Sequence, residues 1–284
     1  MKVLITGCKG MLGQDLVKTF APCHDVAGVD IEDFDITDTN AAMKYIASNK
    51  PNLVIHSAAY TDVDGCEQNR DLAFRVNALG ARNIAAACDE AGAGMVYIST
   101  DYVFDGTKPS PYYEYDNTNP LSVYGRTKLE GENFVKSLCR RHYIVRTSWL
   151  FGMNGKNFVR TMLNLSREKK ILTVVDDQVG SPTYTADLAK ALLELVAKPA
   201  YGLYHITNEG YCSWYEFARY IFDTAGVGGT EVRPITTEEL GRHAPRPRNS
   251  RLEKFYLRLN GYTPLRSYKA AAEEYIKSVG GLYQ

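Results

Sequence analysis

The chain has 284 residues, of which 45% are hydrophobic and 23% are charged, as in an ordinary globular protein of one large domain or two closely packed ones. Lys and Arg together total 33, as do Asp and Glu, so the net charge is zero and no basic excess favours nucleic acid or an anionic membrane as a partner. No apolar run approaches the ~20 residues of a membrane span, and the six cysteines lack metal-binding spacing, so we expect a cytoplasmic protein with reduced thiols.

The chain begins with a short apolar strand, residues 2–6, that leads directly into a glycine-rich turn. Gly7, Gly10 and Gly13 follow the spacing G-x-x-G-x-x-G, and residues 14–20 are predicted to form a helix. Strand, glycine turn and helix in this order are typical of dinucleotide-binding proteins, because the backbone can approach a pyrophosphate and the helix N-terminus attracts its charge. A purely structural turn is the alternative that this spacing leaves open.

The second predicted strand, residues 26–29, ends at Asp30, about 20 residues after the glycine turn. An acidic residue at this place can hydrogen-bond the ribose hydroxyls of NAD. Lys9 lies within the glycine turn, where its charge could meet the 2′-phosphate of NADP. These two residues leave the choice between NADP and NAD open.

Two further segments are candidates for the adenine site. Asp35 and Ile36 follow the second strand, although an ordinary loop explains them equally well. The third predicted strand, residues 53–56, runs into Ala58 and Ala59, whose small side chains leave room for a flat ring beside the backbone.

The segment most suggestive of catalysis begins with an apolar strand, residues 95–98, which ends in Ser99 and Thr100. Tyr124 and Lys128 follow a loop and open a helix, where a spacing of four places both side chains on one face. The ammonium is expected to lower the phenol pKa from about 10 toward neutrality, where a phenol is a useful general acid. The pattern therefore predicts proton transfer to or from a carbonyl or alcohol oxygen.

Strands and helices alternate through the first half of the chain, which predicts an α/β fold with a doubly wound parallel, Rossmann-like sheet. We expect residues 1–150 to form an NAD(P)-binding domain. Residues 151–284 are expected to form mainly a smaller, discontinuous C-terminal substrate-binding lobe. Segments near residues 172–200 are expected to return to the first domain.

These motifs resemble those of the extended short-chain dehydrogenase/reductases, and the resemblance rests on the glycine turn, Ala58-Ala59, Asn77, residues 99–104 and the Tyr124/Lys128 pair. Four later motifs are similar to the dTDP-4-dehydrorhamnose reductase family, and they lie at residues 124–132, 146–149, 177–183 and 246–252. The resemblance covers nearly the whole chain. It implies reduction of the C4 ketone of dTDP-4-dehydro-L-rhamnose to dTDP-L-rhamnose by NADPH or NADH, a step of dTDP-rhamnose biosynthesis.

The resemblance also implies roles for individual residues. Tyr124 is expected to protonate the alkoxide, Lys128 to assist it and bind the nicotinamide ribose, and Thr100, rather than its neighbour Ser99, to orient the substrate oxygen. The expected cofactor-binding residues are Gly7, Lys9, Gly10, Met11, Leu12, Gly13, Asp30, Asp35, Ile36, Ala58, Ala59, Tyr60, Asn77, Tyr124 and Lys128. The expected substrate-binding residues are Thr100, Asp101, Tyr102, Trp149, Arg246 and Asn249.

Several alternatives remain open at this point. Tyr102 and Trp149 could equally fill the core between the lobes, and Arg246 could be a solvated loop charge. Some relatives carry magnesium on acidic residues at a dimer contact, and Asp15 matches one of these, but no second acid lies in register near residues 182–187. We therefore expect no required metal, while a homodimer stays compatible with the sequence.

Two other functions share these motifs. A nucleotide-sugar epimerase or dehydratase would keep its nicotinamide tightly bound without net consumption, although Thr100 is followed by Asp101-Tyr102 rather than by the usual acid pair. A regulatory subunit of methionine adenosyltransferase would bind NADP without a demanding reaction of its own. The expected partner is in any case a dTDP-linked nucleotide sugar, with no nucleic acid and no membrane.

Overall fold

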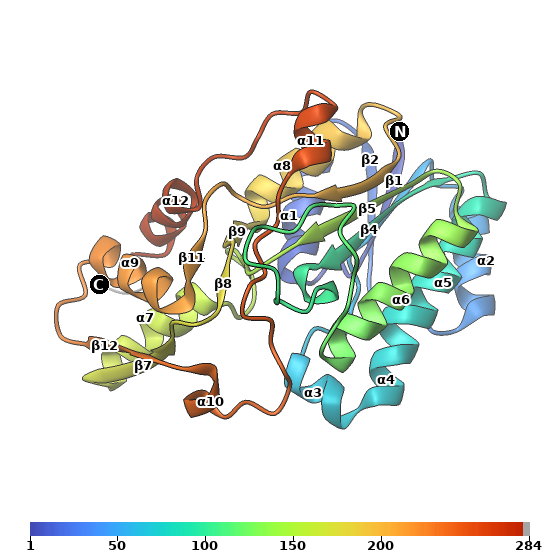
Figure 1. The fold of residues 1–284 in the computed structure, drawn as a ribbon. Helices are drawn as coiled ribbons and strands as arrows, with labels where there is room; N and C mark the ends of the chain where they lie inside the picture. The colour runs from blue at the N-terminus through green and yellow to red at the C-terminus, as the bar shows by residue number, and fades with distance from the viewer. Residues whose placement is uncertain (281–284) are drawn as a thin grey trace.

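A six-stranded, wholly parallel sheet forms the centre of the computed structural model, which describes residues 1–280 (Figure 1). The strands run in the order β10-β5-β4-β3-β1-β2. Their bounds are β1 Lys2–Thr6, β2 Asp25–Val29, β3 Leu53–His56, β4 Gly94–Thr100, β5 His142–Thr147 and β10 Gly202–His205. The strand order reverses between β1 and β3, and ligands bind outside the carboxyl ends of parallel strands at such a reversal. The predicted doubly wound sheet is confirmed.

Helices cover both faces of this sheet (Figure 1). One face packs against helices α1 (Met11–Phe20), α8 (Thr185–Val196) and α11 (Phe255–Leu259). The other face packs against α2 (Thr39–Asn49), α5 (Gly80–Glu90) and α6 (Val123–Leu138). The strands are apolar on both sides because both faces are buried, as β3 shows with Ile55 in one core and Val54 in the other.

Helix α6 begins at a defined residue, which fixes the position of its first turn. The Ser122 hydroxyl accepts a hydrogen bond from the backbone N–H of Gly125 at 3.1 Å, and such caps typically stabilise a helix start by about 1 kcal/mol. Tyr124 therefore lies in the first turn of α6, and Lys128 lies one turn later. Before α6, the chain forms α3 (Val63–Gln68), α4 (Arg70–Phe74), a π-helical turn (Arg75–Leu79) and, after β4, a 3₁₀ turn (Asp101–Val103).

The later part of the chain forms a third apolar core beside the sheet. This core is built by helices α7 (Phe158–Glu168), α9 (Trp214–Ala225) and α12 (Tyr268–Gly280), and the small helix α10 (Thr237–Leu240) lies nearby. Three two-stranded pairs accompany them: β7 (Ile171–Val175) with β12 (Glu231–Ile235), β8 (Val179–Gly180) with β11 (Cys212–Ser213), and β6 (Leu150–Phe151) with β9 (Thr183–Tyr184).

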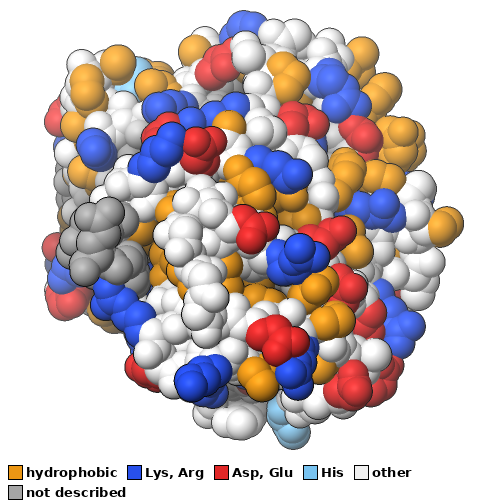
Figure 2. All heavy atoms as spheres, turned by 90° about the vertical axis from the view of Figure 1, so that its left-hand side faces the viewer, with side chains coloured by type: hydrophobic (Ala, Val, Ile, Leu, Met, Phe, Trp, Pro, Cys, Tyr) orange, Lys and Arg blue, Asp and Glu red, His pale blue; other side chains and the backbone are white. Residues whose placement is uncertain are grey.

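The segments expected to return to the first domain behave differently from one another. Helix α8 packs against α1 on the central sheet, whereas β7 pairs in parallel with β12, away from that sheet. The division near residue 150 stays a prediction, and the last four residues of the expected lobe, 281–284, lie outside the described residues. Figure 2 shows basic and acidic side chains interspersed over the face that carries the smaller lobe. Within residues 1–280, no helix has both the length and the apolar character to span a membrane.

Candidate active site

The glycine turn is shaped by close backbone contacts. Gly7 has a φ of 70°, and a Cβ at this position would lie 2.8 Å from the Cα of Ala58 at the end of β3. A Cβ on Gly13 would lie 2.0 Å from the Gly7 carbonyl oxygen. Both positions therefore require glycine, one for the turn and one for the close packing of α1 on β1. The N-terminus of α1, which begins at Met11, faces this cradle, so these residues fit the pyrophosphate of a dinucleotide.

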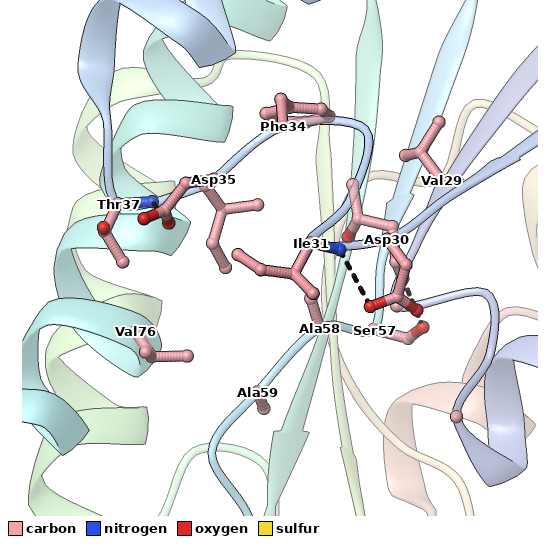
Figure 3. Close-up of a pocket in the computed structure, with 14 residues that line it drawn as sticks. Val29, Asp30, Ile31, Phe34, Asp35, Thr37, Ser57, Ala58, Ala59 and Val76 are labelled. Carbon is pink, nitrogen blue, oxygen red and sulfur yellow. Dashed lines mark hydrogen bonds between the residues drawn. The ribbon is translucent and has the colours of Figure 1, made fainter.

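A pocket of about 300 Å³ lies beside the turn, between the ends of β2 and β3 (Figure 3). Of the residues expected to bind the cofactor, its walls contain Gly7, Gly10, Asp30, Asp35, Ile36, Ala58 and Ala59. The sequence did not single out Ile31, Phe34, Thr37 or Val76, which also line it, and Ile31, Phe34 and Val76 add apolar walls. A pocket of this shape at the strand reversal suits an adenosine group.

A second pocket, of about 440 Å³, adjoins the first and shares Gly7, Gly10, Ser57 and Ala59 with it. Met11, Leu12 and Gly13 line it from the glycine turn. Thr100, Asp101, Tyr102, Tyr124, Lys128 and Trp149 line it from the other elements. The structure thus brings all three predicted catalytic residues to one cleft that continues into the adenosine pocket.

Burial dominates the electrostatics of the Tyr124/Lys128 pair. Burial raises the pKa of Tyr124, although a hydrogen bond with Thr100 acts in the opposite direction. Burial lowers the pKa of Lys128 to about 7. The Lys128 ammonium donates to the Ile98 carbonyl at 2.7 Å and lies 4.1 Å from the centre of the Tyr97 ring. The raised phenol pKa is opposite to the expected lowering, because desolvation by burial is the largest effect on Tyr124.

The two neighbouring hydroxyls at the end of β4 have different partners. Ser99 donates to the buried carboxylate of Glu132 at 2.6 Å. Thr100 accepts from the Tyr102 backbone N–H and donates to the Asp101 carboxylate at 3.0 Å. The Ser99 hydroxyl is therefore occupied within the protein, and Thr100 is the hydroxyl beside Tyr124.

Asp101 lies next to this hydroxyl and is almost fully buried. Burial raises its carboxyl pKa to about 7, and hydrogen bonds with Ser250 and Thr100 oppose this rise. A carboxyl group with such a pKa exchanges its proton near neutrality, so it can hold a substrate hydroxyl either as donor or as acceptor.

Arg246 and Asn249 lie in a connecting segment, residues 241–252, that passes beside α3 before reaching α11 (Figure 1). Arg246 forms a two-pronged ion pair with Asp64 of α3, at 2.9 and 3.2 Å. Asn249 donates to the carbonyl groups of Lys108 and Ser110. Neither side chain is among those lining the 440 Å³ pocket, because both are engaged in fastening this segment to the rest of the chain.

Three of the expected cofactor contacts are also engaged elsewhere. The Asn77 amide exchanges hydrogen bonds with the backbone of Tyr60 and donates to Thr127, so it joins the loop after β3 to α6. Neither Asn77 nor Tyr60 is among the residues lining the two pockets. Lys9 projects to the surface, where its ammonium lies 2.9 Å from the Glu32 carboxylate.

Trp149 forms one wall of the larger pocket and stacks on Trp214, with ring centres 3.5 Å apart and planes inclined by 6°. Its backbone has a φ of 50°, a left-handed conformation that is costly for an aromatic residue. Trp214 also lines the pocket, and the sequence reasoning missed it. The chain has two tryptophans, Trp149 and Trp214, but 65 positions separate them and no local pattern indicates that they meet.

The doubly wound sheet, the glycine turn and the clustered Thr100, Tyr124 and Lys128 together define a dinucleotide-binding protein of the short-chain dehydrogenase/reductase class. The chain belongs to the family described as RmlD substrate binding domain, whose model matches residues 1–280.

Individual relatives match over nearly the whole chain. The spore coat polysaccharide biosynthesis protein SpsK of Bacillus subtilis is 40% identical, and the match covers 97% of each chain. A dTDP-4-dehydrorhamnose reductase structure from Clostridium acetobutylicum is 48% identical with a TM-score of 0.96, covering 98% of this chain and 99% of its own. One from Bacillus anthracis, in complex with NADP, is 44% identical with a TM-score of 0.95 over the same shares.

Proposed function

We propose that the protein reduces the C4 ketone of dTDP-4-dehydro-L-rhamnose to dTDP-L-rhamnose, with NADPH or NADH as the hydride donor. The observation that carries this proposal is the continuous cleft that joins the adenosine pocket to Thr100, Tyr124 and Lys128. The similarity to dTDP-4-dehydrorhamnose reductases over nearly the full chain supports the choice of substrate.

The proposed chemistry needs a proton at the ketone oxygen as that oxygen gains charge. The bound nicotinamide supplies the hydride. Tyr124 donates the proton, and the raised pKa of its phenol keeps that proton in place at neutral pH until charge develops beside it. Thr100 orients the oxygen, and Lys128, in its charged form, stabilises the phenolate that remains.

The sugar is proposed to lie against Trp149 and Tyr102, with Asp101 at its hydroxyls, because all three line the pocket. Arg246 then acts on the sugar through Tyr102, with which it forms a hydrogen bond, while Asp64 holds the guanidinium in place. Direct contacts of Arg246 and Asn249 with the substrate stay a prediction.

The setting of this activity is proposed to be the cytoplasm, and the six free thiols support a reducing compartment. A homodimer stays a prediction. Among residues 1–280 no group of three or more acidic, His or Cys side chains is arranged to hold a metal, and the Asp15 carboxylate accepts a hydrogen bond from Thr185.

The test is oxidation of NADPH and of NADH by the purified protein with dTDP-4-dehydro-L-rhamnose, with identification of the sugar product. Stoichiometric oxidation with formation of dTDP-L-rhamnose is expected. Epimerisation or dehydration without net oxidation would contradict the proposal, as would cofactor binding without turnover, the behaviour of a methionine adenosyltransferase regulatory subunit.

A further inference from the structure

Lys9 lies in the glycine turn between Gly7 and Gly10, which line the adenosine pocket, and its ammonium is paired within the protein. The Lys9 ammonium lies 2.9 Å from the Glu32 carboxylate, and the two side chains are 65% and 62% exposed. Their mutual hydrogen bond raises the pKa of Lys9 and lowers that of Glu32, so both groups are charged at neutral pH. The pair joins the glycine turn to the loop that follows β2.

That loop carries an excess of negative charge. Asp30 accepts hydrogen bonds from the backbone N–H groups of Lys9 and Ile31, at 3.0 and 2.9 Å. Asp33 accepts from the backbone N–H of Asp30 at 2.8 Å. Asp30, Glu32 and Asp33 thus place three carboxylates within four residues, and Figure 3 shows Asp30 at the end of β2 beside Ser57 and Ala58.

The two cofactors meet this loop with different charges. The ribose hydroxyls of NADH can donate to the Asp30 carboxylate, which is fixed by the two backbone contacts. The 2′-phosphate of NADPH brings up to two more negative charges to the same place and needs a cation to offset the carboxylates. Lys9 lies on the glycine turn next to Asp30, but its positive charge is offset by the Glu32 carboxylate.

We propose that Glu32 is a cofactor-specificity residue that weakens NADPH binding by competing with the 2′-phosphate for Lys9. An exposed ion pair is weak and opens readily in water. NADPH therefore binds by drawing Lys9 away from Glu32, whereas NADH leaves the pair intact. This inference deepens the proposed reduction and rests on it for its relevance, but it concerns binding alone.

The test measures dissociation constants for NADPH and NADH, by the change in nicotinamide fluorescence, without any sugar substrate. Glu32→Gln is expected to tighten NADPH binding about two- to fivefold, the size of an exposed charge interaction, with NADH binding unchanged. Lys9→Gln is expected to weaken NADPH binding selectively. In the double variant the Glu32→Gln effect should vanish, because its target cation is gone.

Glu231→Gln is the matched control, since Glu231 also pairs with an exposed cation, Arg233 at 2.8 Å, and the change in net charge is the same. It should leave both constants unchanged. The proposal is overturned if Glu32→Gln affects NADPH and NADH equally, or if its effect persists without Lys9. Failure of the proposed reduction would appear separately, as binding of either cofactor without turnover of the keto-sugar.

Discussion

Replacing Glu132 by Gln removes one charge from a buried ion pair between α6 and β5. Glu132 is fully buried and receives two hydrogen bonds from the Arg146 guanidinium, at 2.8 and 2.7 Å, and one from Ser99. Arg146 is itself only 3% exposed at its side chain, so the variant leaves its charge without a counterion in the interior. Breaking one side of such a buried pair typically costs about 3–5 kcal/mol.

We therefore expect Glu132→Gln to lower the free energy of unfolding by about 3–5 kcal/mol, measured by urea unfolding with tryptophan fluorescence and circular dichroism. Lys136→Gln is the control, because Lys136 approaches the same carboxylate at 3.4 Å from a side chain that is 43% exposed. Its loss should cost less than about 1 kcal/mol. A loss below about 1 kcal/mol for Glu132→Gln would refute the reasoning that Arg146 depends on this carboxylate.

Three further predictions concern the cleft. Tyr124→Phe should lower kcat by about 10²–10⁴-fold, the usual contribution of positioned proton transfer, with the NADPH dissociation constant unchanged; near-full turnover would exclude Tyr124 as the proton donor. Because the lowered Lys128 pKa of about 7 means that its charge is lost as pH rises, kcat/KM should decline above about pH 7 in a pH profile; a decline that begins only near pH 10 would contradict this. Asp64→Asn should raise KM for the sugar about tenfold with less change in kcat, because Arg246 loses the charged partner that holds it beside Tyr102, a proposed sugar contact. Steady-state kinetics showing equal changes in KM and kcat would count against it.

The glycine turn illustrates how much of the fold local sequence determines. The spacing of Gly7, Gly10 and Gly13 after an apolar strand predicted a dinucleotide cradle, and the structure shows backbone contacts at Gly7 and Gly13 that only glycine permits. The alternation of strands and helices likewise predicted the parallel sheet, because apolar runs and turn residues are local signals. Tyr124 and Lys128 could be chosen because their spacing of four places both on one face of a helix, and the family resemblance favoured Thr100 at the end of the preceding strand.

The properties of these same residues depended on the tertiary structure. Sequence spacing suggested that Lys128 lowers the Tyr124 pKa. Burial instead raises the pKa of Tyr124 and lowers that of Lys128, and the degree of burial follows from long-range packing. The partners of Arg246 and Lys9 were also inaccessible to sequence reasoning. Asp64 lies 182 positions from Arg246, so no local pattern could indicate that this arginine pairs with α3.

The sequence by itself thus determined the fold class, the cradle and the side chains proposed to react, because each depends on neighbouring residues and on the regular geometry of strands and helices. The tertiary structure alone decided which charges are buried, which are paired and which remain free for a ligand. Trp214 is the plainest case, since only folding brings α9 against Trp149 to complete the wall of the cleft. Desolvation and contacts between distant residues are properties of the packed chain, and no short segment encodes them.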